Sequence, residues 1–136
     1  MENSLEIGIL LLKQVNKISD FKCAGCQSIQ TAIQVSQLRM LPEIIVITFN
    51  LYHQTTRHAR YFPTTMSFPS VGEYKQLHYH IVGQVEHSGT LNSGHYWARC
   101  RRADGIFTLN DSNVSPSEFM PTPNTYMIAY HYTHGT

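Results

Sequence analysis

The second half of the chain is dominated by segments with the composition of β-strands. The segment from Tyr74 to Glu86 alternates in side-chain character with the period of two that a strand requires. Tyr96 to Arg101 and Ile106 to Leu109 flank the turn sequence Ala103-Asp104-Gly105, which is the pattern of a hairpin. Asn124 to Tyr132 supplies a last strand that is rich in aromatic residues. Neighbouring strands joined by short turns predict a mostly antiparallel sheet.

The first 20 residues follow a different period. Apolar residues recur at three- and four-residue spacing, as in an amphipathic helix; they are Leu5, Ile9, Leu11, Leu12, Val15 and Ile18. Asn3 and Glu6 have the spacing of a capping box, and we expect Ser19-Asp20 to end the helix. Beyond it, alternation from Ala32 to Gln37 and the dense run from Glu43 to Tyr52 predict two further strands. One helix followed by a run of strands makes the predicted fold class α+β.

The composition excludes several classes of protein. The net charge is +1 and there is no basic tract, so neither nucleic acid nor an anionic membrane is an expected partner. The longest apolar run near the start, Ile9 to Leu12, is far too short to cross a bilayer. Glu2 and Glu6 occupy the place of the basic residues of a secretion signal, and three cysteines do not make a disulfide scaffold. We therefore expect a cytoplasmic or nuclear protein with reduced thiols.

A histidine and an asparagine in the second half are the strongest candidates for catalytic residues. The segment from Gly89 to Ala98 delivers His95 from a Gly/Ser loop to the start of a strand, where its ring can face a cleft and act as a general base. Asn110 ends the returning strand of the next hairpin, within cross-strand reach of His95. We expect the Asn110 carbonyl oxygen to accept the Nδ1 proton of His95 and leave Nε2 free. Asp111 follows and would point the opposite way in a regular strand.

The residues beside His95 have weaker signals. Gly94 has no side chain, so a substrate backbone could pass close by. The chain has eight histidines, and most of them must be ordinary. On spacing alone, a structural histidine remains the competing interpretation of His95.

Cys23 and Cys26 have the spacing of zinc ligands. One Cys-x-x-Cys is half of a site, because structural zinc takes four ligands. His53 or His58 would have to contribute to complete the site within this chain. The alternative is a knuckle that lacks metal or shares one with another segment. No cofactor is otherwise expected.

Six blocks, in order, resemble the ubiquitin-specific proteases, a family of papain-like cysteine proteases that cut after the C-terminal glycine of ubiquitin. The blocks resemble the family's helix leading to its second finger Cys-x-x-Cys, a Leu-Pro followed by a hydrophobic strand, a Tyr-x-Leu…His-x-Gly strand, the histidine box, the Asn-Asp box and the closing aromatic strand. They lie at Ser4 to Cys26, Ala32 to Phe49, Tyr74 to Gly89, Gly94 to Tyr96, Phe107 to Val114 and Tyr126 to Tyr130.

The resemblance implies a fold, a function and a set of roles. Residues 1–136 would form part of a catalytic domain, with a helix and half of the fingers in 1–40 and the palm in 41–136. The expected partner is ubiquitin or a ubiquitinated protein. The implied catalytic residues are His95 as general base, Asn110 as its orienting residue and Asp111 as a supporting group. Gly94, Tyr96 and His87 would lie at the substrate, with a buried structural histidine as the alternative for His87, and Cys23 and Cys26 would belong to the fingers.

The sequence also departs from the family. Nothing matches the box that carries the nucleophilic cysteine at a helix start, and Cys100 comes after His95 whereas the family's cysteine comes before it. The oxyanion-hole side chain that precedes the nucleophile is absent too. The family's Lys-Arg-Phe is Asn50-Leu51-Tyr52 here, and Ile106 stands where the family has Trp.

These departures lead to three alternatives. The first is the C-terminal half of a deubiquitinase, which is inactive alone and needs a thumb segment that carries the cysteine. The second is a non-catalytic module, a pseudoprotease that binds ubiquitin or another protein. The third is an α+β protein with coincidental matches, in which His95 and Asn110 would lie far apart.

Overall fold

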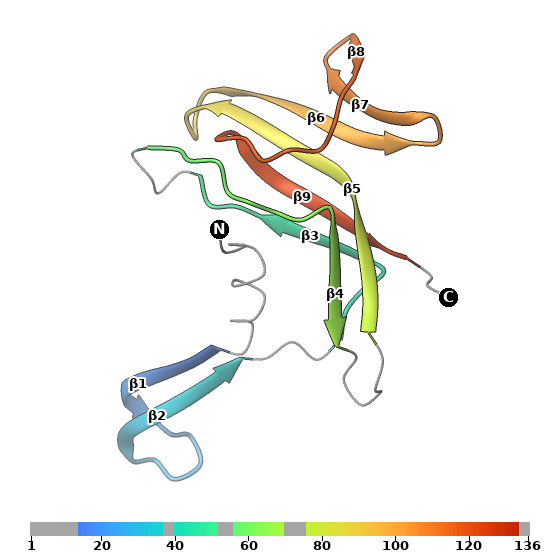
Figure 1. The fold of residues 1–136 in the computed structure, drawn as a ribbon. Coiled ribbons are helices and arrows are strands. Elements are labelled where there is room, and N and C mark those ends of the chain that lie inside the picture. Colours follow the sequence, from blue (N-terminus) through green and yellow to red (C-terminus); the bar gives the residue numbers. More distant parts are fainter. Residues whose placement is uncertain (1–13, 37–39, 52–55, 70–75, 134–136) are drawn as a thin grey trace.

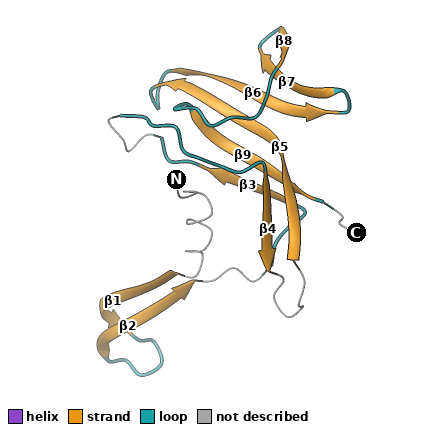
Figure 2. Ribbon diagram, viewed as in Figure 1, coloured by secondary structure: helices purple, strands orange, loops and turns teal. Residues whose placement is uncertain are grey.

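The computed structural model describes residues 14–36, 40–51, 56–69 and 76–133, and these residues form strands, turns and loops (Figures 1 and 2). The strands are β1 (Gln14–Lys22), β2 (Ile29–Ser36), β3 (Ile44–Thr48), β4 (Thr65–Pro69), β5 (Gln76–Gly89), β6 (Gly94–Arg102), β7 (Gly105–Asn110), β8 (Asn113–Pro116) and β9 (Thr125–Tyr132). Within these ranges no helix occurs, and so none is long and apolar enough to cross a membrane.

Two sheets contain all the strands. β1 and β2 form a hairpin of their own, while the larger sheet has seven strands in the order β3-β9-β5-β6-β7-β8, with β4 paired to β5. Every strand pair is antiparallel. The mostly antiparallel sheet predicted from the sequence is therefore confirmed. In Figure 1 the β1–β2 hairpin extends away from the larger sheet.

The predicted N-terminal helix is not supported. Its described part is strand β1, and its capping box at Asn3 and Glu6 lies outside the described residues. Val15 pairs with Val35 across the hairpin, so cross-strand backbone pairing has overridden a helical spacing of apolar residues. The Ser19-Asp20 signal marks a shift of register between Ile18 and Phe21, where Asp20 adopts a left-handed φ of 56°.

The loop that delivers His95 is shorter than predicted. The sequence predicts a Gly/Ser loop between the strand that ends at Glu86 and His95, but Ser88 pairs with His95 and Gly89 with Gly94, which leaves only Thr90 to Ser93 outside the strands. The Thr90 amide donates to the Ser93 carbonyl at 2.7 Å and closes this turn. The short loop fixes the backbone of His95 in the sheet.

One hydrophobic core lies on the face of the larger sheet that the 56–63 segment covers, and β4 contributes to it as a strand of that sheet. Its buried members are Phe49, Leu51, Phe62, Met66, Phe68, Tyr79, Ile81, Ile128 and Tyr130. The two buried tyrosines direct their hydroxyls to backbone carbonyls, Tyr130 to Pro63 and Tyr79 to Pro42, each at 2.6 Å. A buried phenol needs such a partner, and these bonds fasten the 56–63 segment and the residues just before β3 to the sheet.

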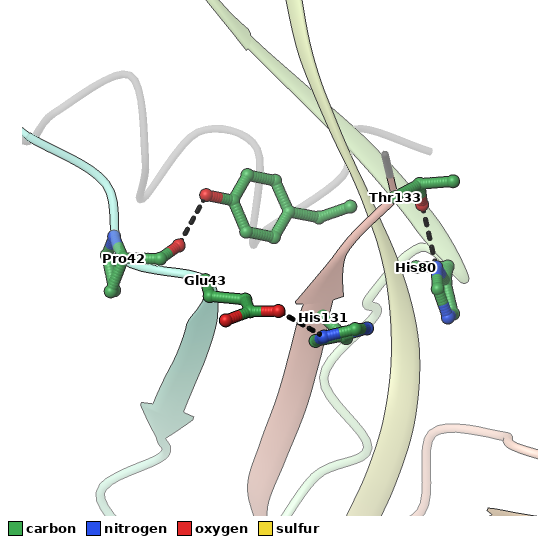
Figure 3. A network of polar contacts seen from close by, with 6 residues as sticks. Pro42, Glu43, His80, His131 and Thr133 are labelled. Atoms are coloured by element: carbon green, nitrogen blue, oxygen red, sulfur yellow. Dashed lines mark hydrogen bonds and ion pairs between the residues drawn. The ribbon is translucent and has the colours of Figure 1, made fainter. Parts of the chain in front are cut away.

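The end of β9 is held by polar contacts to both of its neighbours (Figure 3). The His131 Nε2 atom lies 3.2 Å from the Glu43 carboxylate, just before β3. His80 on β5 contacts the Thr133 hydroxyl through Nδ1 at 2.7 Å. The contacts fix the β3-β9-β5 register at the end of the sheet far from His95.

Candidate functional site

His95 and Asn110 converge at one edge of the larger sheet. His95 is the second residue of β6 and Asn110 is the last residue of β7. The His95 Nε2 atom lies 2.7 Å from Asn110 Oδ1, and since an amide oxygen only accepts, Nε2–H is the donor. The predicted pairing of the two side chains is confirmed, and the third alternative, which required them to lie far apart, is not supported.

The nitrogen that makes this bond is not the predicted one. We expected Nδ1 to face the amide, but the structure uses Nε2 and leaves Nδ1 as the ring nitrogen available to a reactant. A cross-strand argument specifies that two side chains meet, but it does not specify the rotation of the ring about its χ angles.

Asp111 lies in a turn and not in a strand. Asp111 and Ser112 form the two-residue connection between β7 and β8, whose flanking residues Asn110 and Asn113 are paired. Asp111 has a left-handed φ of 53°, a conformation that Asp and Asn tolerate better than most residues. The prediction from regular strand geometry is therefore wrong for this residue, and β8 is a strand that the sequence analysis missed.

Trp97 flanks the histidine on the exposed rim. Its ring stacks on that of His95 with centroids 5.8 Å apart and an interplanar angle of 21°. Residues two apart in a strand share a face, so the pair follows from the sequence of β6. The indole restricts the positions open to the imidazole, and His95 itself stays exposed.

His87 lies beneath the start of β6. Its side chain is 1% exposed, and its ring centroid is 4.4 Å from that of Tyr96. A Cβ placed on Gly94 would collide with His87 Nε2 and would lie 2.5 Å from the Ser88 carbonyl oxygen. The space above Gly94 is thus occupied by the protein itself, and the buried structural role weighed for His87 agrees with this packing. Tyr96, 52% exposed, remains open to a ligand.

Arg57 is a site residue that the sequence analysis missed. Its guanidinium donates to the backbone carbonyls of His87 at 2.6 Å and Gly89 at 2.7 Å, and Nη1 also lies 3.2 Å from Asn124 Oδ1. Its Nη2 atom is 3.4 Å from His87 Nδ1. Arg57 comes from a polar loop without periodicity, so no sequence signal distinguished it.

A buried carboxylate supports the segment behind the site. Glu86 is 0% exposed and accepts hydrogen bonds from Gln84, Thr122 and Thr125. Gln84 Nε2 also donates to the Met120 carbonyl, and the Met120 amide donates to Gln84 Oε1. These bonds hold the 117–124 segment against β5, and they satisfy a carboxylate that would otherwise be costly to bury.

The stability of the fold should fall as the pH is lowered through about 6.5, the ordinary pKa of histidine. Burial first, and then Arg57, lowers the pKa of His87, while burial, Arg101 and His131 lower that of His80. Around that pH the unfolded chain therefore binds more protons than the folded chain, so acid favours unfolding. Urea unfolding at pH values of about 7.5 and about 5.5 measures the change. His87→Gln should reduce the difference in stability between the two pH values, and substitution of the exposed His58 by Gln is the control. Equal urea midpoints of the wild type at both pH values would contradict the role given to these histidines.

Cys23 and Cys26 lie at the tip of the β1–β2 hairpin. The Cys26 Sγ atom is 3.0 Å from the Ser28 hydroxyl. Hydrogen bonds with the Ser28 hydroxyl and backbone, and then with the Cys23 thiol, lower the pKa of Cys26 to about 7. A low pKa favours the thiolate that zinc binds. The donor set nevertheless fits only half of a zinc site, because the described ranges hold no group of three or more His, Cys, Asp or Glu residues that could bind a metal.

The cysteine on β6 is poorly placed to react with His95. Cys100 pairs with Gly83 and Phe107 in the middle of the sheet. It is five residues from His95 along one strand, which corresponds to about 17 Å and to opposite faces. Cys23 and Cys26 lie in the turn between β1 and β2, which form a separate two-stranded sheet. The prediction that Cys100 is not the partner of His95 agrees with this arrangement.

Comparisons of the sequence with known proteins agree on one family. The family model described as "Ubiquitin carboxyl-terminal hydrolase" matches residues 9–130. Ubiquitin carboxyl-terminal hydrolase 8 of Saccharomyces cerevisiae is 28% identical over 123 residues, which are 76% of this chain and 26% of that protein. Human ubiquitin carboxyl-terminal hydrolase 2 is 26% identical over 121 residues, or 79% of this chain and 20% of that protein. The chain thus spans about a quarter or less of these relatives.

Solved structures give the same fold. A structure of the yeast SAGA DUBm matches with a TM-score of 0.75 and 25% identity, over 99% of this chain and 34% of that chain. A SAGA DUB module of Ubp8, Sgf11, Sus1 and Sgf73 bound to monoubiquitin matches with a TM-score of 0.73 and 22% identity, over 99% of this chain and 34% of that chain.

Proposed function

Because the chain belongs to the ubiquitin carboxyl-terminal hydrolase family, we propose that it supplies the general base of a deubiquitinating thiol peptidase. The family resemblance predicted from the six blocks is confirmed by the match over residues 9–130. The observation that carries the proposal is the 2.7 Å hydrogen bond from His95 Nε2 to Asn110 Oδ1. This bond is the base–orienter contact that a Cys-His-Asn site needs.

In the proposed reaction His95 acts through Nδ1. Asn110 holds the proton on Nε2, so Nδ1 has a lone pair that can accept the proton of a thiol. The thiolate then attacks the carbonyl carbon of the C-terminal glycine of ubiquitin, and the bond from that carbon to the amine of the conjugated protein breaks. The imidazolium returns its proton to the leaving amine, and water assisted by His95 hydrolyses the thioester. Asp111, in the turn after Asn110, is proposed as a supporting carboxylate at the same rim.

We propose that the nucleophilic thiol comes from a segment outside these 136 residues. Cys100 is separated from His95 along β6, and the other two cysteines lie on the β1–β2 hairpin. This proposed segment would correspond to the thumb expected from the resemblance. Two thiols of the hairpin, Cys23 and Cys26, are proposed as two of the four ligands of a zinc ion shared with such a segment.

A second candidate is a non-catalytic ubiquitin-binding module. Ubiquitin is bound in one of the structures that share this fold. Tyr96 is 52% exposed beside His95, so an aromatic contact surface exists whether or not a thiol is present. Both candidates would bind ubiquitin, so only catalytic activity distinguishes the binding module from the enzyme.

The reduced thiols remain the basis for proposing the cytoplasm or nucleus as the location of the protein.

The chain alone should bind ubiquitin without cleaving it. We expect neither hydrolysis of a fluorogenic ubiquitin substrate nor labelling by a ubiquitin vinyl-sulfone probe, because acyl transfer needs a thiolate beside His95. The check is mass spectrometry after incubation with the probe, with a family member that has its cysteine as the positive control. An adduct on Cys23, Cys26 or Cys100 would show that the assignment of the nucleophile is wrong.

Titration of isotope-labelled ubiquitin with the chain separates the remaining possibilities. Shifts of ubiquitin amide signals, together with activity after a thumb segment is supplied, support the enzyme. Shifts without any activity support the binding module. An absence of shifts at millimolar protein removes the binding module.

A further inference from the structure

We propose that Arg57 is a positioning residue for His95, acting through the end of β5 and the first residues of β6. This inference rests on the proposed function, because it assumes that His95 is the base. It concerns a side chain that lies in the 56–63 segment and contacts neither His95 nor Asn110 in any recorded hydrogen bond.

The guanidinium of Arg57 joins three parts of the chain. It donates to the carbonyl oxygens of His87 and Gly89, which are the third-last and last residues of β5. Its Nη1 atom also donates to the side-chain oxygen of Asn124, the residue just before β9. The backbone carbonyl of Asn124 in turn accepts a hydrogen bond from the His87 amide at 2.9 Å. Hydrogen bonds to a charged donor are stronger than neutral ones, so this group ties β5, β9 and the covering segment together.

The two carbonyls that Arg57 holds are next to the strand pairs that carry His95. Gly89 pairs with Gly94, and Ser88 pairs with His95. Any movement at the end of β5 is therefore passed directly to the start of β6. With the backbone of His95 displaced, Nε2 would lose its alignment with Asn110 Oδ1.

The buried ring of His87 provides a second connection. Arg57 Nη2 lies 3.4 Å from His87 Nδ1, and since a guanidinium only donates, Nδ1 must be the unprotonated nitrogen. The ring held in this way packs against Gly94 and against Tyr96, the two neighbours of His95. Arg57 thus supports His95 from both sides along the chain.

The shape of the contact requires arginine. The two terminal nitrogens donate to different carbonyls, His87 O from Nη1 and Gly89 O from Nη2. A planar guanidinium can make both bonds at once, whereas a single ammonium or amide group has one donor centre. A side chain selected only for positive charge would not need this geometry.

The experiment compares Arg57→Ala with Arg102→Ala in the full 136-residue chain. Arg102 is an exposed residue at the end of β6, so its substitution removes the same charge at a distance from the site. We expect backbone amides from Ser88 to Tyr96 to exchange with solvent about tenfold faster in the Arg57 variant. We expect no such change at the Ala98–Leu109 pair of the same strand. The order of the His95 ring, from 13C relaxation at Cε1, should fall in parallel, and added methylguanidinium should restore both.

Each outcome bears on the inference. Unchanged exchange and ring order in folded Arg57→Ala would overturn it, and so would an equal effect of Arg102→Ala. If Arg57→Ala does not fold, Arg57→Gln carries the test, because one amide NH₂ cannot reach both carbonyls; exchange as slow as in the wild type would then overturn it. None of these measurements uses catalysis. A failure of the proposed function would instead appear as inactivity with a thumb supplied, while the response to Arg57 substitution remained.

Discussion

Replacing Gly94 by Ala will destabilise the domain by about 2–4 kcal/mol, although only one methyl group is added. The new Cβ would overlap His87 Nε2, and it would lie 2.9 Å from His87 Cε1 and 2.5 Å from the Ser88 carbonyl oxygen. The ring cannot retreat easily, because it is 1% exposed and contacts Tyr96 and Arg57. The free energy of unfolding from urea titration is the measurement.

Two further variants test the cause of that loss. At Gly83, a Cβ would lie 3.6 Å from the Ala129 Cβ, which is ordinary van der Waals contact, so Gly83→Ala should have a much smaller effect. Adding His87→Ala to Gly94→Ala should recover part of the stability, because the ring is removed while the Ser88 carbonyl remains. Equal losses at Gly83 and Gly94 would contradict the packing argument.

His95 and Asn110 show which part of the site can be predicted from the sequence. His95 and Asn110 were predicted together because the hairpins that carry them are consecutive, so local turn signals determine which strands are neighbours. The packing of His87 against Gly94 is not predicted from the sequence, because the two residues belong to separate segments of the pattern. Tertiary packing decides which side chain lies against a glycine, and the spacing of residues in the sequence does not specify that packing.

Other misses have equally specific causes. Val15 and Ile18 fit a helical period, but pairing of β1 with β2 decides the structure of that segment. β8 has four residues and ends at Pro116, so it offers too little pattern to detect. The bonds of Arg57 span separations of 30 to 67 residues, a range at which single-sequence periodicity carries no information.

The site therefore divides into a part that local rules specify and a part that tertiary contacts specify. The base and its amide come from one continuous run, β6 to β7, and a hydrogen bond joins their side chains directly. The supports come from elsewhere: Arg57 from the 56–63 segment and Asn124 from the residues just before β9. Substitutions in the first group should affect chemistry, whereas those in the second should affect the rigidity of the rim.

Fusing the chain behind the cysteine-bearing segment of a family member should give a deubiquitinase in which His95→Ala lowers kcat/KM by about 10³-fold or more. The loss follows because the substitution removes the proposed acceptor of the thiol proton, so the reactive thiolate is rarely formed. Asn110→Ala should cost less, about tenfold to 100-fold, since it removes one 2.7 Å hydrogen bond to Nε2 but leaves the base in place. Hydrolysis of a fluorogenic ubiquitin conjugate measures both, with His58→Ala, at an exposed residue, as the control. If His95→Ala retains the activity of the parent fusion, His95 is not the base and the chain acts only as a surface for ubiquitin.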